Sequence, residues 1–338
     1  MTNVNRQWVL AKRPHGKVGK ANFEYREGRV PKPADGKVLV KNVYLSFDPT
    51  QRGWMEDRPS YLPPVKLGEV MRASSVGQVV QSNHPDFAQG DFVMTGGGWQ
   101  DYCVASPSGS PFGLTKLPPG VPPTMPLSVL GVTGLTAYWG LLDLGKPQAG
   151  ETVLVSGAAG ATGSIAGQIA RIKGCRVVGI AGGAAKCKWL KQKARFDAVI
   201  DYKNEDVDAR IGKLCPKGVD IYFDNVGGDI LEAALNHLAM RARVVLCGGI
   251  SGYNATKPVP GPANLMNLVI TRSRLEGFIV IDYMTRNHIA IPELLGWITS
   301  GELVYQEDIQ EGFKNIPATL TRLFSGKNNG KQLLKIDG

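Results

Sequence analysis

The sequence predicts an α/β protein with a β-rich, barrel-like first domain and a second domain built on a doubly wound parallel sheet. At 338 residues, the chain is longer than one ordinary domain. From about Trp8 to Asp101, short alternating apolar patterns broken by Gly and Pro are typical of antiparallel strands. From about Glu151 onward, β-branched runs alternate with helical patterns, which indicates parallel strands joined by right-handed crossovers.

A proline-dense stretch, KLPPGVPPTMPL (residues 116–127), separates these two patterns. Proline cannot continue a helix or a central strand, so the stretch marks a boundary. The tail carries a helical pattern, FKNIPATLTRLFSG, and then a short strand pattern, KQLLKI, which we expect to rejoin the first domain. We therefore place the first domain at residues 1–124 and 301–338 and the second at residues 125–300.

Composition and charge narrow the class of protein. Hydrophobic residues make up 43% of the chain and charged residues 20%, which is typical of a globular protein, and no apolar run reaches the length of a membrane span. The five scattered cysteines contain no CxxC pair, so we expect neither a disulfide framework nor a zinc lobe. With no signal-peptide pattern at the N-terminus, we expect a cytoplasmic protein without a membrane partner.

A net charge of +10 favours anionic ligands. The lysines are spread widely, and neither an arginine-rich segment nor an RNA-binding aromatic motif is present. We therefore expect no nucleic-acid partner.

The stretch VSGAAGATGSIAGQIA (residues 155–170) joins a buried strand pattern to an amphipathic helix. Glycines at this spacing let the chain turn tightly, bring backbone N–H groups against a pyrophosphate, and pack the helix on the strand. In its context of further β/α alternations, the turn predicts a dinucleotide-binding site. The residues of this predicted site are Gly157, Gly160, Ala161, Thr162 and Gly163.

The choice between NADH and NADPH depends on the end of the second strand, RVVGIA. An Asp or Glu there would bind the ribose 2′-hydroxyl of NAD. The strand instead leads into Gly182 and Gly183, and Lys186 follows. With a lysine and no carboxylate at this point, the sequence favours NADPH.

Several motifs in one order resemble the zinc-independent medium-chain dehydrogenase/reductases, in the group of leukotriene B4 dehydrogenase, prostaglandin reductase and plant alkenal double-bond reductase, which includes curcumin reductase-like proteins. They are SFDPTQRGWM, PPVKLGEVM, GVTGLTAYWGL, GAAGATGSIAGQIAR, FDNVGG, CGGISGYN, EGFIV and KNNGKQLLKI. The resemblance covers nearly the whole chain. It implies a GroES-like β-barrel catalytic domain, a Rossmann domain that binds NADPH, and a homodimer.

The resemblance also assigns roles to single residues. It implies that Lys186 and Tyr202 contact the 2′-phosphate, that Tyr253 contacts the substrate carbonyl, and that Tyr61 lines the substrate entrance. Further positions match those around the nicotinamide or its linking phosphates: Asn225, Cys247, Phe278, Val280 and Asn328.

Two departures from related sequences bear on function. The group commonly has DPYMRGRM where this chain has DPTQRGWM, so an aromatic side chain that would face the substrate is replaced by Thr50, which leaves the substrate preference open. Zinc-dependent relatives carry a Gly-His-Glu element and a four-cysteine lobe. This chain has Leu67-Gly68-Glu69 and no lobe, so we expect no metal site.

Reduction of a conjugated C=C bond suits a site without metal. Hydride delivered to the β-carbon of an α,β-unsaturated aldehyde or ketone leaves an enolate, which needs a hydrogen bond at its oxygen and a proton at the α-carbon. We expect Tyr253 to donate that hydrogen bond, and Tyr253 or solvent to supply the proton. Two alternatives remain open: an NADPH-dependent quinone reductase, and a non-catalytic NADPH-binding protein with a structural or RNA-associated role.

Overall fold

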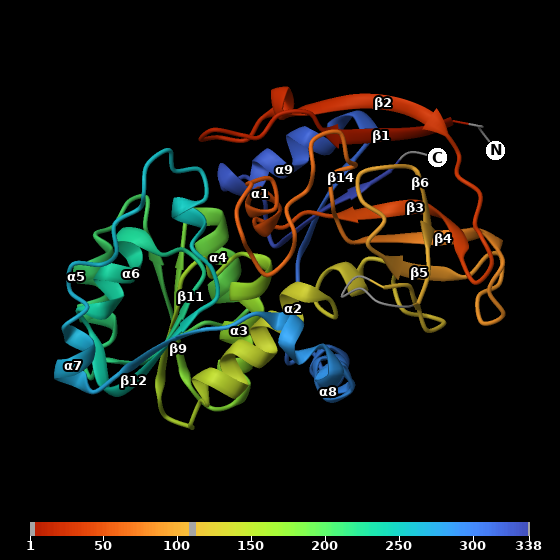
Figure 1. Ribbon diagram of the computed structural model, residues 1–338. Helices are drawn as coiled ribbons and strands as arrows, with labels where there is room; N and C mark the ends of the chain where they lie inside the picture. Colours follow the sequence, from red (N-terminus) through yellow and green to blue (C-terminus); the bar gives the residue numbers. More distant parts are fainter. Residues whose placement is uncertain (1–3, 108–112, 337–338) are drawn as a thin grey trace. The chain divides into compact units, whose positions relative to one another are not determined.

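The computed structural model describes residues 4–107 and 113–336 (Figure 1). The chain divides into two compact units, one formed by Met1–Ser128 with Glu307–Gly338 and the other by Val129–Gln306. The first is rich in strands and the second is built on a parallel sheet, which confirms the predicted fold class.

The first unit contains a seven-stranded sheet in the order β14-β15-β3-β4-β5-β7, with β6 paired to β3. Apart from the parallel pair β14 and β15, its strand pairs are antiparallel. The strand from the tail, β15, pairs with β3 at Leu334 and Leu45, as the KQLLKI pattern predicted. The strands are β3 (Val38–Ser46), β4 (Ser75–Ser82), β5 (Phe92–Thr95), β6 (Tyr102–Ala105), β7 (Thr115–Lys116), β14 (Glu307–Glu311) and β15 (Lys331–Lys335).

A separate antiparallel ribbon belongs to the same unit and consists of β1 (Val4–Leu10) and β2 (Phe23–Arg29). Trp8 and Leu10 from this ribbon are buried in one cluster with Phe313 and Leu334. The N-terminal ribbon and the C-terminal segment therefore share one hydrophobic core. The helical elements of the unit are α1 (Thr50–Gly53), α9 (Ile316–Phe324) and the short turns η1 (Lys20–Asn22), η2 (Met125–Leu127) and η6 (Phe313–Asn315).

The second unit contains a six-stranded sheet in the order β10-β9-β8-β11-β12-β13, and every neighbouring pair is parallel. The central strands carry continuous apolar runs, as strands covered on both faces do. The strands are β8 (Thr152–Val155), β9 (Arg176–Ala181), β10 (Ala198–Asp201), β11 (Val219–Asp224), β12 (Leu238–Leu246) and β13 (Arg274–Gly277).

Helices cover this sheet on both faces. In Figure 1, α5 and α6 lie on one side of the sheet and α3 lies on the other. In residues 4–107 and 113–336, no helix is both long and apolar enough to cross a membrane. The helical elements are α2 (Val132–Trp139), η3 (Gly140–Gly145), α3 (Ala161–Ile172), α4 (Ala184–Gln192), α5 (Val207–Leu214), α6 (Gly228–Leu235), η4 (Ile250–Gly252), α7 (Asn267–Thr271), η5 (Val280–Arg286) and α8 (Asn287–Thr299).

Helix α3 packs closely because small residues line its buried face. A Cβ atom at Gly167 would lie 2.1 Å from Cζ of Phe196, so this ring occupies the space that a side chain would need. Ile165 and Ile169 on the same helix are fully or almost fully buried. The close packing fixes the start of α3 relative to the strand before it.

Candidate functional site

The order of the strands reverses direction between β8 and β11. From β8 the chain proceeds outward through β9 to β10, and it then returns to β11 on the other side of β8. Ligands of open parallel sheets bind outside the carboxyl ends of the strands at such a reversal. The segments that follow β8, β11 and their neighbours therefore form the candidate site.

The turn after β8 has the geometry that a pyrophosphate group requires. Gly157 adopts a φ of +57°, and a Cβ atom at Gly163 would lie 2.5 Å from the carbonyl oxygen of Gly157. Helix α3 begins directly after Gly160 and has no side-chain cap at this end. The first N–H groups of a helix lack partners within it and lie at its positive end, so the turn offers an uncapped donor site for a phosphate.

A buried carboxylate, Asp224, holds the ends of β8 and β11 together. Its side chain is fully buried and accepts hydrogen bonds from the hydroxyl groups of Ser156 and Tyr222, both at 2.7 Å. The N–H groups of Val226 and Gly227 also donate to it, at 3.0 and 3.1 Å. Burial, and then the charge of Asp224, raise the pKa of Tyr222, so its phenol stays protonated and donates.

Asn225, predicted as a cofactor residue, strengthens the same junction. Its N–H donates to Oγ of Ser156 at 2.9 Å, and its side-chain amide donates to the carbonyl of Ser156 at 2.7 Å. Gly157 follows Ser156 and packs against the Asn225 side chain. A Cβ atom added to Gly157 would lie 3.4 Å from the Cβ atom of Asn225. The structure therefore brings Asn225 and the glycine turn together.

The loop after β12 joins this junction. The N–H of Cys247 donates to the carbonyl of Asp224 at 2.9 Å, and the N–H of Ile250 donates to the carbonyl of Asn225 at 3.3 Å. Burial, and then the charge of Asp224, raise the pKa of the Cys247 thiol to about 12. The thiol is thus protonated at neutral pH, and Cys247 is unsuited to act as a nucleophile.

Tyr253 lies in the same loop and is half-buried. Its hydroxyl oxygen accepts a hydrogen bond from the N–H of Gly249 at 3.2 Å. This bond uses an oxygen lone pair and not the hydroxyl proton. The structure therefore fixes the Tyr253 hydroxyl close to the loop that follows β12.

Lys186 and Tyr202 lie at the carboxyl edge of β9 and β10. Lys186 is in the first turn of α4, which follows β9, and it is half-buried. Tyr202 directly follows β10, and a Cβ atom at Gly182 would lie 2.7 Å from its ring. The Tyr202 ring thus covers the turn that leads from β9 into α4.

The structure adds a carboxylate that the sequence pattern did not reveal. Asp201, the last residue of β10, accepts the N–H of Gly183 at 2.8 Å and the side-chain amide of Asn204 at 2.8 Å. These hydrogen bonds, chiefly the one from Gly183, lower the pKa of Asp201. Strand β9 itself does not end in an acidic residue. The neighbouring strand β10 instead places the Asp201 carboxylate beside Gly183, where several hydrogen-bond donors surround the carboxylate.

Phe278 and Val280 follow β13. A Cβ atom at Gly140 would lie 2.4 Å from Cζ of Phe278, and the ring makes an edge contact with Tyr283 at a centroid distance of 6.4 Å. The Phe278 side chain thus packs within the second unit and remains half-buried. Val280 begins the turn η5.

The remaining two predicted residues, Tyr61 and Asn328, belong to the first unit. The Tyr61 side chain is 46% exposed, and its hydroxyl is hydrogen-bonded to that of Thr50. The tyrosine ring therefore lies beside the position where related sequences carry an aromatic residue and this chain carries Thr50.

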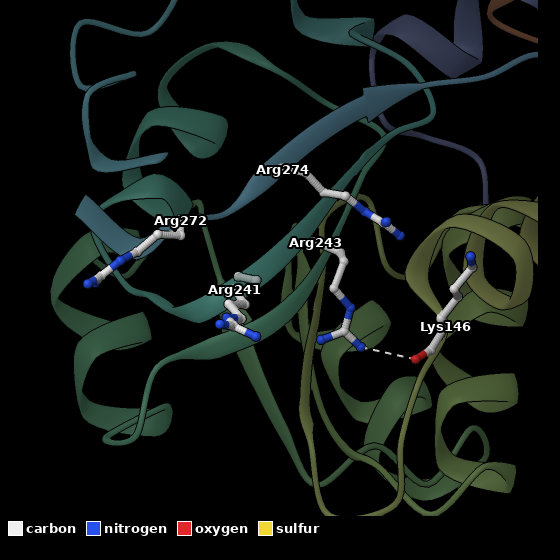
Figure 2. Close-up of a pocket in the computed structure, with 6 residues that line it drawn as sticks. Lys146, Arg241, Arg243, Arg272 and Arg274 are labelled. Carbon is white, nitrogen blue, oxygen red and sulfur yellow. Dashed lines mark hydrogen bonds between the residues drawn. The ribbon is translucent and has the colours of Figure 1, made fainter. Parts of the chain in front are cut away.

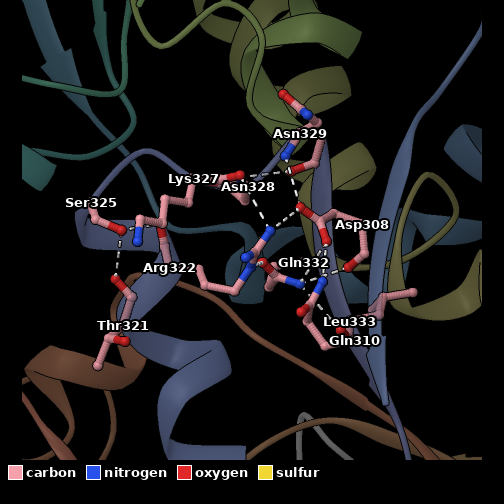
Figure 3. A network of polar contacts seen from close by, with 11 residues as sticks. Asp308, Gln310, Thr321, Arg322, Ser325, Lys327, Asn328, Asn329, Gln332 and Leu333 are labelled. Carbon is pink, nitrogen blue, oxygen red and sulfur yellow. Dashed lines mark hydrogen bonds and ion pairs between the residues drawn. The ribbon is translucent and has the colours of Figure 1, made fainter. Parts of the chain in front are cut away.

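A polar network fixes the turn that carries Asn328 (Figure 3). Arg322 donates to the carboxylate of Asp308 at 2.8 Å and to the carbonyl of Lys327 at 3.3 Å. The same carboxylate accepts the N–H of Asn329 at 3.2 Å. Burial alone would raise the pKa of Asp308, but the hydrogen bonds, above all that from Arg322, lower it overall. The residues on both sides of Asn328 are thus held by one ion pair.

The Asp224 junction yields a testable prediction. All four donors reach Oδ1 of Asp224, and the N–H of Gly227 also reaches Oδ2 at 3.1 Å, so in Asp224→Asn the new amide NH2 group faces the N–H of Gly227, donor against donor. We expect a loss of about 2 kcal/mol in the free energy of unfolding, measured with urea, together with weaker NADPH binding.

The matched control is Asp220→Asn. Asp220 lies near the other end of β11, where its carboxylate accepts the N–H of Thr152 at 2.8 Å. This variant should keep the wild-type affinity for NADPH. Equal affinities of the Asp224→Asn variant and the wild type would show that the junction does not support the cofactor site.

Two family models match most of the chain. Residues 6–111 match the family model described as the N-terminal domain of oxidoreductase, and residues 161–300 match the model described as zinc-binding dehydrogenase. In the described part of the chain, no three His, Cys, Asp or Glu residues are grouped so that they could hold a metal ion.

Individual relatives match over most of their length. The NADPH-dependent curcumin reductase of Escherichia coli is 46% identical over 99% of this chain and 97% of its own. The NADP(+)-dependent 2-alkenal reductase of Nicotiana tabacum is 39% identical over 88% of this chain and 87% of its own. The crystal structure of CurA from Vibrio vulnificus in complex with NADPH is 41% identical, with a TM-score of 0.93 over 98% of this chain and 99% of its own. The chain therefore belongs to the zinc-independent medium-chain dehydrogenase/reductases, in the group of curcumin and alkenal reductases.

Proposed function

We propose that this protein uses NADPH to reduce the C=C bond of α,β-unsaturated aldehydes and ketones. The observation that carries the proposal is the carboxyl edge of the parallel sheet, where the uncapped glycine turn, Lys186 and the Tyr253 hydroxyl are all found. The relatives that match over most of the chain include a curcumin reductase and a 2-alkenal reductase that use NADPH or NADP(+).

Residues of the second unit would hold the cofactor. The turn at residues 157–163 would bind the pyrophosphate through backbone N–H groups, and Lys186 with Tyr202 would contact the 2′-phosphate. We assign the positions nearer the nicotinamide to Asn225, Cys247, Phe278 and Val280, and to Asn328 from the first unit. When bound, NADPH supplies the hydride that adds to the β-carbon of the substrate.

Tyr253 is our candidate for the substrate oxygen. Negative charge develops on the carbonyl oxygen as the β-carbon is reduced, and a phenol that donates a hydrogen bond there stabilises it. Because the Tyr253 oxygen already accepts the N–H of Gly249, the ring is held in place before substrate binds. The α-carbon then takes its proton from Tyr253 or from solvent.

We assign the cofactor to a domain of residues 125–300 and substrate selection largely to the β-rich domain of residues 1–124 and 301–338. Tyr61 is the aromatic residue that we expect at the substrate entrance. Related sequences carry an aromatic residue at the position of Thr50, and Tyr61 would take the role of that residue. The Tyr61 hydroxyl is hydrogen-bonded to the Thr50 hydroxyl.

We further propose a cytoplasmic homodimer. Strand β13 ends the parallel sheet, and such an edge can pair with a second copy. Apolar residues just before it are strongly exposed: Leu265, Met266, Val269 and Ile270 have exposed fractions of 46 to 66%. An apolar surface beside a sheet edge is typical of a protein interface, and a monomer in sedimentation equilibrium would contradict the proposal.

The function is tested by following NADPH oxidation at 340 nm with a short alkenal and with a bulky aromatic enone. We expect turnover with NADPH, little with NADH, and a product that has gained two hydrogens at the C=C bond. The substrate that is reduced faster reports the size of the pocket. Turnover of quinones to hydroquinones without any enone reduction would instead indicate a quinone reductase, and the absence of any turnover with NADPH bound would indicate a non-catalytic protein.

Lys186→Ala tests the cofactor assignment. Removing a charge-assisted contact to the 2′-phosphate should raise the Kd of NADPH about tenfold or more and leave that of NADH nearly unchanged. Lys188→Ala is the matched control, since Lys188 is an exposed lysine of the same helix. Equal weakening of NADPH and NADH binding would show that Lys186 does not read the 2′-phosphate.

Tyr253→Phe tests the catalytic assignment. Loss of a hydrogen-bond donor to a developing oxyanion should lower kcat about 100-fold, and the Kd of NADPH should change much less. Thermal unfolding of the variant reports separately on the lost bond to Gly249. A kcat equal to that of the wild type would remove Tyr253 from the mechanism.

A further inference from the structure

The opposite, amino-terminal edge of the parallel sheet carries a cluster of basic residues around a shallow cavity of about 360 Å³ (Figure 2). Among the described residues that line it, Ala242 is the one without charge. The basic lining residues, called here the basic pocket, are Lys146, Arg241, Arg243, Arg272 and Arg274. None of them belongs to the candidate cofactor site, which lies beyond the carboxyl ends of the same strands.

One arginine forms the frame of the basic pocket. Arg243 makes two hydrogen bonds to the carboxylate of Glu151, at 2.6 and 2.8 Å, and donates to the carbonyls of Gly145 at 2.8 Å and Lys146 at 3.1 Å. Figure 2 shows it directed toward the Lys146 carbonyl. The two carbonyl contacts hold the turn at Lys146 beside β12. The positive charge of Arg243 is paired with Glu151.

The other basic residues carry charge that is less well compensated. Arg274 approaches Glu276 at 3.7 Å and donates to the carbonyl of Leu144. In the part of the chain that the structure describes, Lys146, Arg241 and Arg272 have no carboxylate within ion-pair distance. Arg272 is bonded instead to Met240 and the carbonyl of Ile270, and Figure 2 shows it directed away from Arg274. The pocket therefore holds an excess of positive charge.

The backbone of the basic pocket is also unusual. Lys146, Arg241 and Arg272 adopt φ angles of 49°, 61° and 50°, and Arg195 is the one other non-glycine residue with positive φ in the described chain. Glycine is the ordinary choice for this left-handed conformation, because a Cβ atom is disfavoured there. Residues held in disfavoured backbone conformations cluster at ligand sites.

The ends of helices account for part of this pattern. Lys146 follows η3 and Arg272 follows α7, and a cation is also favoured at the carboxyl end of a helix. Arg241 lies within β12, so that explanation does not apply to it. At Arg241 the chain carries a long cation, exposed and without a carboxylate partner, where glycine would be the least strained residue.

From these observations we propose that the basic pocket binds a small anion with two or more linked phosphate groups. Guanidinium groups match phosphate oxygens in geometry and charge. No aromatic residue is among the described residues that line the pocket, so they offer a base no stacking surface. Lys146, Arg241 and Arg274 would contact the phosphates, and Arg243 would keep the turn at Lys146 in position. This inference does not depend on the proposed reductase function.

The test is calorimetric titration of the full-length protein with tripolyphosphate in low-salt buffer. The protein is first saturated with NADPH, so that phosphate contacts at Lys186 are occupied. We expect one saturable site in the wild type. In the variant that combines Lys146→Gly and Arg241→Gly, the affinity should fall about tenfold or more, because two charged contacts are lost. The absence of saturable binding to the wild type would overturn the proposal.

The matched control is Arg195→Gly, which is compared with Arg241→Gly alone, because each removes one arginine charge and one left-handed non-glycine position in the second unit. All these glycine variants should have a raised Tm without ligand, since the strain is relieved, which shows that they are folded. The control should bind tripolyphosphate like the wild type. An equal loss of affinity in Arg195→Gly and in Arg241→Gly would mean that only overall charge matters, and the proposed site would be wrong.

Two further ligands test the chemical class. ATP carries the same chain of phosphates, so an affinity close to that of tripolyphosphate would support recognition of the phosphates alone. Citrate carries several negative charges on carboxylates. Binding of citrate as tight as that of tripolyphosphate would overturn the assignment to phosphates.

Discussion

The carboxylate of Asp224 is the constraint on which the candidate site depends. It is fully buried, and it accepts hydrogen bonds from Ser156 at the end of β8 and from Tyr222 on its own strand. A buried carboxylate is stable only when its oxygens are satisfied in this way. The donors come from the ends of both strands. If β8 and β11 separated, the Asp224 carboxylate would lose hydrogen bonds or become exposed to solvent. The glycine turn begins at the next residue after Ser156, so its position follows from that of Asp224.

Close packing carries this constraint outward. Gly163 and Gly167 lie on one helix, where a Cβ atom would meet the Gly157 carbonyl and the Phe196 ring, respectively. The helix is thereby held against the sheet at its first two turns, and its uncapped amino end is held at a fixed distance from the end of β8. A phosphate site made of backbone N–H groups needs such rigidity, since no side chain adjusts to the ligand.

Local patterns in the sequence were sufficient to predict the fold class, the glycine turn and the position of Lys186. Each of these depends on residues that are close together in the chain: the alternation of strands and helices, the spacing of the glycines, and the end of β9. Helix α5, in contrast, was not predicted, although Asp206 caps its first turn. Its apolar residues Val207, Ile211 and Leu214 do follow helical spacing, but eight residues are shorter than the window over which such a pattern is usually recognised.

Contacts between distant residues were beyond the reach of those patterns. Asp201 and Gly183 are 18 positions apart, and only the pairing of β10 with β9 brings the carboxylate to the N–H group. The contact between Thr50 and Tyr61 depends on a loop of irregular backbone, which no periodicity describes. The FDNVGG motif is a second example, because it indicated Asn225 and not Asp224. Asp224 becomes buried only when β11 pairs with β8 and β12.

The two edges of the parallel sheet differ in the residues that adopt left-handed backbone. At the carboxyl edge the left-handed positions are glycines, such as Gly157, so that a ligand can approach the backbone itself. At the amino edge Gly150, Gly174 and Gly218 are left-handed as well, but long cations such as Arg241 also adopt this conformation there and project charge away from the backbone. A site of the first kind selects a ligand by the close fit of N–H groups, whereas a site of the second kind selects by charge and tolerates differences in shape. The proposed cofactor site and the proposed anion site would thus select their ligands in different ways at the two edges of one sheet.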